Sequence, residues 1–348
     1  MLLTCEQVSA GHPDKICDQI SDAIVTDCLS HDKNSRVAVE CMIKNDDVFI
    51  AGELTSKHEP DFRGLALGIL KRIGLEDADH YQTHIFISKQ SPDIAMGVDA
   101  GGAGDQGTVY GYATDETPEM LPVPFVLATN TLELLRAANI DGLLPDAKCQ
   151  VSYDTRKKRI TTFLLSTQHR EDIPIEEVRL IGKLIMETAA QGMHLNTDYK
   201  ALVNPTGRFV TGGSFADTGV TGRKIIADSY GCVCHHGGGA FSGKDPTKVD
   251  RSGAYMARKI ARDVVNKGFA NRCEIALSYA IGVNTPVAIA VDCFGTNKVP
   301  IQELVSTIRL YYNLSPQSII SELRLRDVDY NTVSAYGHFG KAWLPWEQ

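Results

Sequence analysis

Hydrophobic positions recur along this chain in the two periods that distinguish helices from strands. The apolar residues Ile16, Ile20 and Ile24 are spaced like one face of a helix, and Asp18 and Asp22 fall between them. The same helical spacing predicts later helices at residues 61–73, 124–138, 175–191, 246–266, 301–311 and 315–325. Runs of strand-forming residues predict strands at residues 36–43, 48–54, 83–88, 108–112, 148–154, 159–166, 274–283 and 287–294.

The first predicted elements follow the order helix, strand, strand, helix, strand, and a similar order returns twice later along the chain. Such alternation predicts an α/β protein of the α+β type that is built from three similar α/β units. We expect the units at residues 1–98, 99–212 and 213–348, with true boundaries that are discontinuous. The sequence has no low-complexity linker between them, so the units should pack tightly.

Composition narrows the possible functions. The chain has 348 residues and a mass of 38.0 kDa, which exceeds the usual size of a single hydrophobic core. Its formal net charge of −8 argues against general nucleic-acid binding, which needs a basic surface. Nine cysteines without framework spacing favour reduced thiols in a cytoplasmic protein. No apolar run in the sequence approaches membrane length, so no membrane partner is expected.

The stretch of residues 237–251 carries the clearest chemical signal. It combines three consecutive glycines with two lysines, an arginine and aspartates. Glycine lets the backbone approach an anion closely, lysine neutralises the anion, and aspartate can hold the Mg²⁺ that accompanies polyphosphates. The stretch therefore predicts a polyphosphate site in a nucleotide enzyme. An ordinary P-loop is disfavoured because Asp245 replaces its Ser/Thr, and a flexible glycine loop before a charged helix stays open as a purely structural alternative.

Three other motifs allow more than one interpretation. The glycine pattern of residues 102–107 matches a dinucleotide fingerprint, but a strand rather than a helix is expected after it, which leaves only Asp105 as a candidate ligand. The run from Cys232 to His236 resembles one half of a Cys/His zinc-binding motif, but the sequence has no second half at a suitable distance. We therefore favour the alternative that this run is a buried strand that leads into the glycine loop. His12 at a helix start could donate a proton to a leaving oxygen or simply cap the helix.

Six segments closely resemble the signature segments of the S-adenosylmethionine synthetase (methionine adenosyltransferase) family. The similarity extends from about Thr4 to Trp346, and the motifs occur in the order that the family has. These segments are residues 11–15, 89–93, 102–107, 204–209, 221–226 and 237–251.

The resemblance implies a fold of three units with pseudo-threefold symmetry, and it implies a particular reaction. The sulfur of L-methionine attacks C5′ of ATP in line, and the tripolyphosphate that leaves is then hydrolysed to pyrophosphate and phosphate. A thioether has no proton to lose, so catalysis should come from positioning and from stabilising charge on the departing oxygen. The implied cofactors are Mg²⁺, with two ions per site, and K⁺, with one ion per site.

The same resemblance implies roles for individual residues. His12 resembles the residue at the leaving O5′, and the expected catalytic set is His12, Lys148, Arg223 and Lys244. The positions that resemble ATP-binding residues are His12, Asp146, Lys148, Arg208, Phe209, Asp217, Arg223, Lys224, Ala240 and Lys244. Those that resemble methionine-binding residues are Glu53, Gln90, Asp105, Asp217 and Lys248. Asp14 and Asp250 resemble Mg²⁺ ligands, and Glu40 resembles the carboxylate of the K⁺ site.

The family also implies a partner, which is a second copy of the chain. Its members form homodimers with active sites shared between two subunits, often paired into tetramers. Two departures stand out here: Ala10 replaces a usual acidic residue, and the segment from Gln90 to Asp105, a mobile gate in the family, is short. These departures leave open a second hypothesis, in which the chain is a degenerate relative of the family that binds nucleotide without turnover. A phosphotransferase that uses the glycine loop as a variant P-loop stays open as well.

Overall fold

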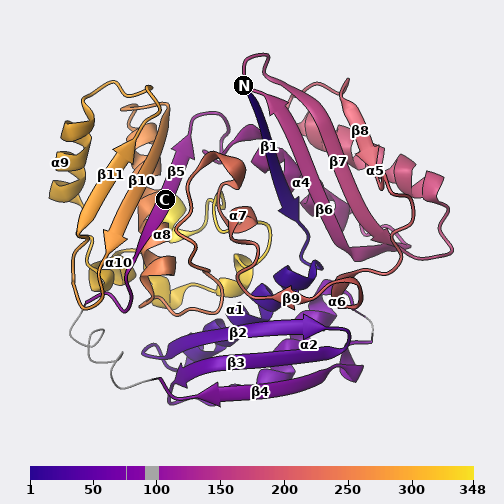
Figure 1. The fold of residues 1–348 in the computed structure, drawn as a ribbon, viewed down its shortest axis with the longest axis horizontal. Helices are drawn as coiled ribbons and strands as arrows, with labels where there is room; N and C mark the ends of the chain where they lie inside the picture. The colour runs from indigo at the N-terminus through magenta and orange to yellow at the C-terminus, as the bar shows by residue number, and fades with distance from the viewer. Residues whose placement is uncertain (76, 91–101) are drawn as a thin grey trace.

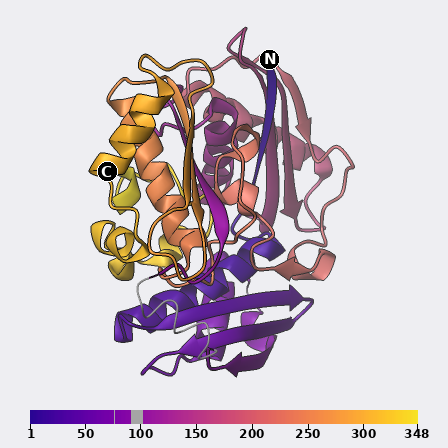
Figure 2. The ribbon, with the colours of Figure 1, turned by 60° about the vertical axis from the view of Figure 1, so that its left-hand side comes forward.

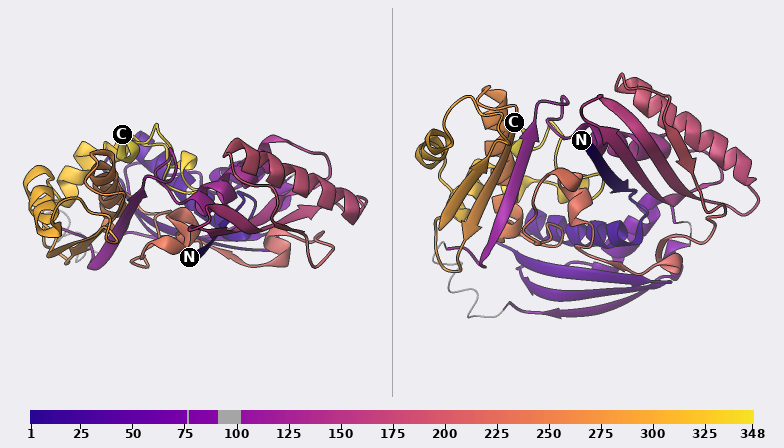
Figure 3. Two further views of the ribbon diagram at one scale, coloured as in Figure 1. Left: turned by 90° about the horizontal axis from the view of Figure 1, so that it is seen from above. Right: turned by 45° about the horizontal axis from the view of Figure 1, so that its top comes forward.

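Three β-sheets surround the centre of the molecule, one at the bottom of Figure 1 and two above it. The computed structural model describes residues 1–75, 77–90 and 102–348. Viewed from above, the molecule is wide and thin (Figure 3). Most of the predicted gate segment, residues 91–101, lies outside the described residues.

The first sheet has the strand order β4-β3-β2-β9, and helices α1 and α2 belong to it. Its strands are β2 (Arg36–Lys44), β3 (Asp47–Thr55), β4 (Gln82–Ser88) and β9 (Gly219–Val220). Its helices are α1 (Pro13–His31) and α2 (Phe62–Ile73). The one-turn helices α6 (Gly213–Ala216) and α7 (Ile225–Asp228) flank β9 in the chain.

The second and third sheets repeat this plan. The second has the order β1-β6-β7-β8 with strands β1 (Leu2–Val8), β6 (Leu143–Asp154), β7 (Arg159–His169) and β8 (Lys200–Val203), and helices α4 (Val123–Ala137) and α5 (Ile175–Gly192). The third has the order β11-β10-β5 with strands β5 (Gly107–Thr114), β10 (Arg272–Tyr279) and β11 (Ala288–Asp292). Its helices, beside the strands in Figure 2, are α8 (Val249–Asn266), α9 (Ile301–Tyr311) and α10 (Pro316–Glu322).

Each sheet borrows one strand from a distant part of the chain. β1 pairs antiparallel with β6, β5 pairs with β10, and β9 pairs with β2. The exchange is cyclic, since the N-terminal segment completes the second sheet, the central segment the third, and the C-terminal segment the first. The expected three similar units with pseudo-threefold arrangement are therefore present, and their sheets are built from discontinuous segments.

Most predicted elements lie within a few residues of the observed ones, but one prediction was wrong. Residues 231–233 form a short 3₁₀ turn in which Cys232 is exposed, so no buried strand leads into the glycine loop. The strand predicted after residues 102–107 is confirmed as β5, which agrees with rejecting a Rossmann site. Three short or terminal strands, β1, β8 and β9, were not predicted. None of the helices in the described ranges is both long and apolar enough to cross a membrane.

Helix α8 packs so closely on β5 that a side chain on the strand would not fit between them. A Cβ built on Gly111 of β5 would lie 2.0 Å from the carbonyl carbon of Ala257 and 2.2 Å from the backbone nitrogen of Arg258. Backbone atoms of a buried helix cannot move aside cheaply, because protein interiors are close-packed. Gly111 therefore sets the distance between this helix and the third sheet.

Gly111→Ala is expected to destabilise the protein by about 1–3 kcal/mol, because the methyl group must push α8 off the sheet. The matched control is Gly68→Ala in α2, where a new Cβ meets nothing within 4 Å. That substitution should stabilise by roughly 0.4–1 kcal/mol, because alanine favours the helix. Urea unfolding of both variants checks the pair. Equal effects at the two positions would contradict the close-approach argument.

Candidate active site

A cavity of about 480 Å³ opens at the end of the first sheet where β2 begins and β3 and β4 end. Its walls come from the ends of these strands, from the segment before β5 and from the start of α8. They include six residues that the sequence analysis assigned to the site: Glu53, Gln90, Asp105, Lys244, Lys248 and Asp250. Carboxylates, cations and an amide from distant parts of the sequence thus meet around one space.

The glycine loop reaches this cavity because it lies alongside β2 like an additional strand. The backbone N–H of Val39 donates to the carbonyl of Gly243 at 2.9 Å, and Asp245 N–H donates to the carbonyl of Val37 at 3.0 Å. The Asp245 carboxylate also accepts from Val37 N–H at 2.7 Å and pairs with Lys248 at 2.7 Å. Burial opposes its ionisation, but the Lys248 ammonium holds the pKa of Asp245 below its usual value.

Steric packing explains two glycines of this loop. Gly243 has a φ of +81°, and a Cβ there would lie 2.0 Å from the carbonyl oxygen of Val39. A Cβ on Gly239 would lie 2.4 Å from Oδ1 of Asp250. Gly243 therefore requires glycine whether or not an anion approaches the loop, whereas a side chain at position 239 would displace the Asp250 carboxylate.

Lys244 and Asp250 neutralise each other in the cavity. The Lys244 ammonium lies 2.6 Å from Oδ2 of Asp250, and each side chain keeps about a quarter of its surface exposed. Lys244 resembles a triphosphate-binding lysine and Asp250 a metal ligand. Their ion pair places the predicted triphosphate-binding group next to the predicted metal ligand.

A second group of predicted residues surrounds the N-terminus of α1. The fully buried Asp14 accepts from Val220 N–H at 2.9 Å and pairs with Lys224 at 2.5 Å. Nε of Arg223 lies 3.4 Å from the same carboxylate. His12 is the N-cap of α1, where its Nδ1 accepts from the backbone N–H of Asp14 at 3.2 Å. Cations and a carboxylate therefore crowd a helix N-terminus, which itself favours anions.

Burial sets the protonation states beside this helix end. It lowers the pKa of His12 to about 4, and the nearby Lys224 charge acts in the same direction. At neutral pH the imidazole is therefore uncharged, and because Nδ1 accepts a hydrogen bond, Nε2 carries the proton. Burial also raises the pKa of Asp146 to about 6, although its hydrogen bond from Gly213 N–H opposes the shift.

Strand β2 contacts both groups of residues and shows how far apart they are. Its residue Ala38 bridges to Lys244 of the cavity, whereas Met42 pairs with Val220 beside Asp14. Four residues of strand place the groups about 13 Å apart along β2. Glu40, the predicted K⁺ ligand, is exposed midway between them.

The remaining predicted residues extend the second group or lie apart from it. Lys148 of β6 pairs with Glu6 at 3.0 Å, and the Lys148 and Asp217 charges both act on the pKa of His12. A Cβ built on Gly222 would lie 2.6 Å from the Cβ of Ala240. The glycine loop therefore packs against the segment that carries Arg223 and Lys224. Exposed Arg208 pairs with Glu171 at 2.7 Å beyond β8, and half-buried Phe209 follows it.

Sequence reasoning missed the buried charges that support both groups. Asp22 of α1 accepts two hydrogen bonds from the guanidinium of Arg251, at 2.8 and 2.7 Å, and both side chains are completely buried. Arg251 also donates to the carbonyl of Lys244 at 2.9 Å, and Asp22 accepts from Gly243 N–H at 3.0 Å. The polar positions of an amphipathic helix are usually solvated, and only the acidic spacing along α1 hinted otherwise.

Comparison with known proteins places the chain in a family. Models of the N-terminal, central and C-terminal domains of S-adenosylmethionine synthetase match residues 1–92, 100–209 and 211–348. The chain belongs to the S-adenosylmethionine synthetase family. It is 44% identical to an S-adenosylmethionine synthase of Treponema denticola and 43% identical to one of Desulfosudis oleivorans, with 99% of this chain and 95% of each relative covered.

Family membership confirms the predicted enzyme class and activity, which is that of a methionine adenosyltransferase. It also confirms the expected fold, because the chain matches three synthetase domains and the structure contains three sheets with their helices. Dependence on metal ions is consistent with this family. Both groups of residues described above lie on segments that the family models cover.

Asp22→Asn is expected to destabilise the synthetase by about 3–5 kcal/mol, because it leaves the buried Arg251 guanidinium without a counter-charge. The control is Asp198→Asn, which breaks an exposed pair with Arg159 and should cost less than about 1 kcal/mol. Chemical denaturation measures both changes in unfolding free energy. A loss at Asp22 no larger than that at Asp198 would contradict the supporting role of the buried pair.

Proposed function

We propose that this synthetase joins ATP and L-methionine by in-line attack of the methionine sulfur on C5′. The S–C5′ bond forms as the C5′–O5′ bond breaks, and the tripolyphosphate leaves with the electron pair before it is hydrolysed to pyrophosphate and phosphate. The observation that carries the proposal is the neutral His12 at the N-terminus of α1, surrounded by Lys224 and Arg223. Such a site stabilises negative charge that develops on a leaving oxygen.

In this mechanism His12 donates a hydrogen bond from Nε2 to O5′ instead of transferring a proton. A group with a pKa of about 4 holds almost no imidazolium at neutral pH. Lys148, Arg223, Lys224 and Lys244 supply fixed positive charge to the triphosphate, which removes the need for a strong acid. Asp146, Arg208, Phe209, Asp217 and Ala240 complete the proposed nucleotide site.

The cavity suits methionine. Its carboxylates Glu53 and Asp105 can hold the substrate ammonium, and Lys248 with the amide of Gln90 can hold the carboxylate. A volume of about 480 Å³ accommodates an amino acid of this size. We assign Asp217 to the same substrate from its place beside His12 and Asp146.

Carboxylate oxygens are the ligands that Mg²⁺ prefers, and Asp14 and Asp250 fit that preference. Each now pairs with a lysine, at 2.5 and 2.6 Å, and would exchange that lysine for Mg²⁺ when the lysine turned to a bound polyphosphate. We propose these residues as holders of two Mg²⁺ ions per site and Glu40 as the holder of one K⁺. The metal ions would supply positive charge at the triphosphate.

We propose that two copies of the chain share their active sites. The face of the first sheet that carries Glu40 also exposes the apolar Met42 and Phe86, with 40% and 65% of their surfaces accessible. A second copy turned by a two-fold axis across β2 would cover this apolar face and place the His12 group of one chain over the cavity of the other. We also propose that such dimers pair into tetramers and that the protein is located in the cytoplasm.

Incubation of the purified chain with ATP, L-methionine, Mg²⁺ and K⁺ is expected to yield S-adenosylmethionine, pyrophosphate and phosphate. Chromatography of the nucleotides separates this result from the alternatives. ADP as the product would indicate a phosphotransferase, and tight ATP binding without turnover would indicate a degenerate relative. Either outcome, over a full range of both ions, contradicts the proposed function.

Mixing two inactive variants tests the shared site. His12→Ala and Lys244→Ala should each lose about 10²–10³-fold in kcat, because each removes a charge or hydrogen bond made in the transition state. In a mixed dimer one site carries both lesions and the other carries none. After random reassociation the activity should therefore return to about a quarter of the parent value.

The control for this experiment mixes His12→Ala with Asp14→Asn, two lesions of the same residue group. Both sites of that mixed dimer stay damaged, so no recovery is expected. If labelled subunits exchange and the first mixture also stays inactive, each chain builds its own site.

A further inference from the structure

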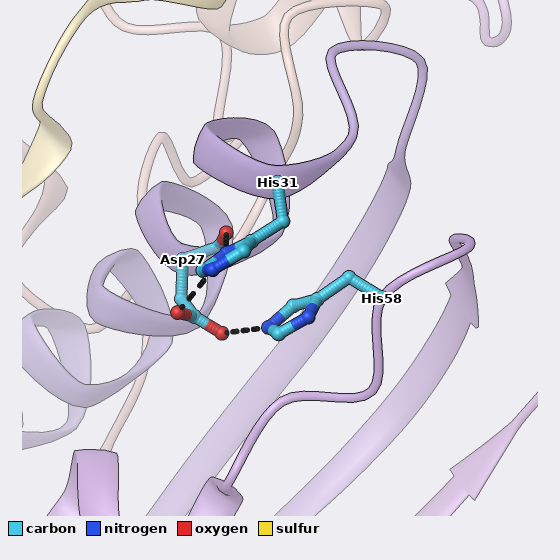
Figure 4. A group of neighbouring side chains, drawn as sticks. All are labelled: Asp27, His31 and His58. Carbon is cyan, nitrogen blue, oxygen red and sulfur yellow. Dashed lines mark hydrogen bonds and ion pairs between the residues drawn. The ribbon is translucent and has the colours of Figure 1, made fainter.

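Three side chains capable of binding metal converge at the C-terminal end of α1, and none of them was assigned to the active site (Figure 4). Nε2 of His58 lies 2.7 Å from Oδ2 of Asp27, and Nδ1 of His31 lies 3.6 Å from Oδ1 of the same carboxylate. One ligand atom from each of the three lies within 4.8 Å of the others. It is the only such trio among the residues that the structure describes.

The backbone holds these three side chains in place without help from a ligand. Asp27 and His31 are one helical turn apart on α1, so they share a face. His58 lies between β3 and α2, where its own N–H donates to Ser56 at 3.0 Å and the preceding N–H, of Lys57, donates to Asp32 at 3.1 Å. The chain thus brings the segment after β3 against the end of α1.

We propose that Asp27, His31 and His58 form a binding site for a divalent transition metal of the Zn²⁺ class. Two imidazole nitrogens and a carboxylate oxygen suit Zn²⁺, Ni²⁺ or Co²⁺ and disfavour Mg²⁺, which prefers oxygen ligands. Three protein ligands leave one position for water. The site is therefore distinct in chemistry from the Mg²⁺ and K⁺ positions proposed above.

Binding requires a small rearrangement of the histidines. Their rings are stacked, with centroids 3.9 Å apart and planes inclined by 11°, whereas a metal must lie in the plane of each ring that binds it. His31 can turn because its side chain is 54% exposed. Its Nδ1 must release its contact with the carbonyl of Asp27 at 2.9 Å and carry no proton.

A bound metal would tie the end of α1 to the segment that enters α2. It binds the folded chain only, since the unfolded chain does not hold the three ligands together, and so it raises the stability. The active site should not require it.

Titration calorimetry of the full chain with Zn²⁺ at neutral pH tests the proposal. The parent should bind one Zn²⁺ that excess Mg²⁺ does not displace. Loss of a residue that only supports a metal ligand typically weakens metal binding by roughly 10–100-fold. His31→Ala and His58→Ala each remove a ligand itself, so each should weaken Zn²⁺ binding by at least this factor. His80→Ala, which removes an exposed histidine outside the trio, should leave it unchanged.

Thermal unfolding gives a second readout that does not depend on activity. Zn²⁺ should raise the Tm of the parent and of His80→Ala, and raise it less in His58→Ala. If Zn²⁺ bound elsewhere, such as at thiols, it would raise the Tm of all variants equally, which would contradict the proposal. Equal affinity in the parent, His31→Ala and His58→Ala, or no measurable Zn²⁺ binding by the parent, would overturn the proposal.

Discussion

The buried ion pair between Asp22 and Arg251 is the contact on which both halves of the proposed active site depend. Asp22 sits in the helix whose first turn presents His12 and Asp14, and Arg251 sits in the first turns of α8 beside Asp250. The guanidinium also lies 4.0 Å above the ring of Tyr330, which adds a cation–π contact in the C-terminal segment. A charged core is a costly way to join two helices, but its directional hydrogen bonds fix their relative orientation.

A second layer of buried charge continues from this pair toward the N-terminus of α1. Lys15 pairs with Asp18 at 3.0 Å and also contacts Asp228, and all three side chains are buried. Burial would favour the neutral lysine, but the two carboxylates outweigh it and raise the pKa of Lys15. The helix that carries His12 is therefore held by ionic contacts on several sides.

Periodicity was enough to predict the helices and the long strands, because each buries one face and shows it in the sequence. It could not find β9, whose two residues carry no pattern, nor β1, whose partner β6 lies far along the chain. The strand predicted around Cys232 is a short 3₁₀ turn instead, because the close spacing of two cysteines does not distinguish a strand from a turn. Asp18 and Asp22 were misleading in the same way, since spacing does not reveal that a charge meets a buried partner.

Candidate site residues came from motif resemblance, and the structure adds how they are grouped. Glu53, Lys244 and Asp250 meet because β3 and the glycine loop end at one edge of a sheet, which no spacing within the sequence encodes. The glycines of that loop satisfied packing as well as any role toward an anion, as Gly243 illustrates. Chemistry was therefore easier to predict than placement.

The cyclic exchange of β1, β5 and β9 has a consequence for how the chain folds. The first sheet needs Val220, so it cannot be completed while the N-terminal third alone has left the ribosome. Contacts of such high sequence separation raise contact order, which slows folding and exposes unpaired strand edges in the meantime. Nascent chains should thus wait in partly assembled form until the C-terminal third is synthesised, and they become dependent on chaperones during that interval.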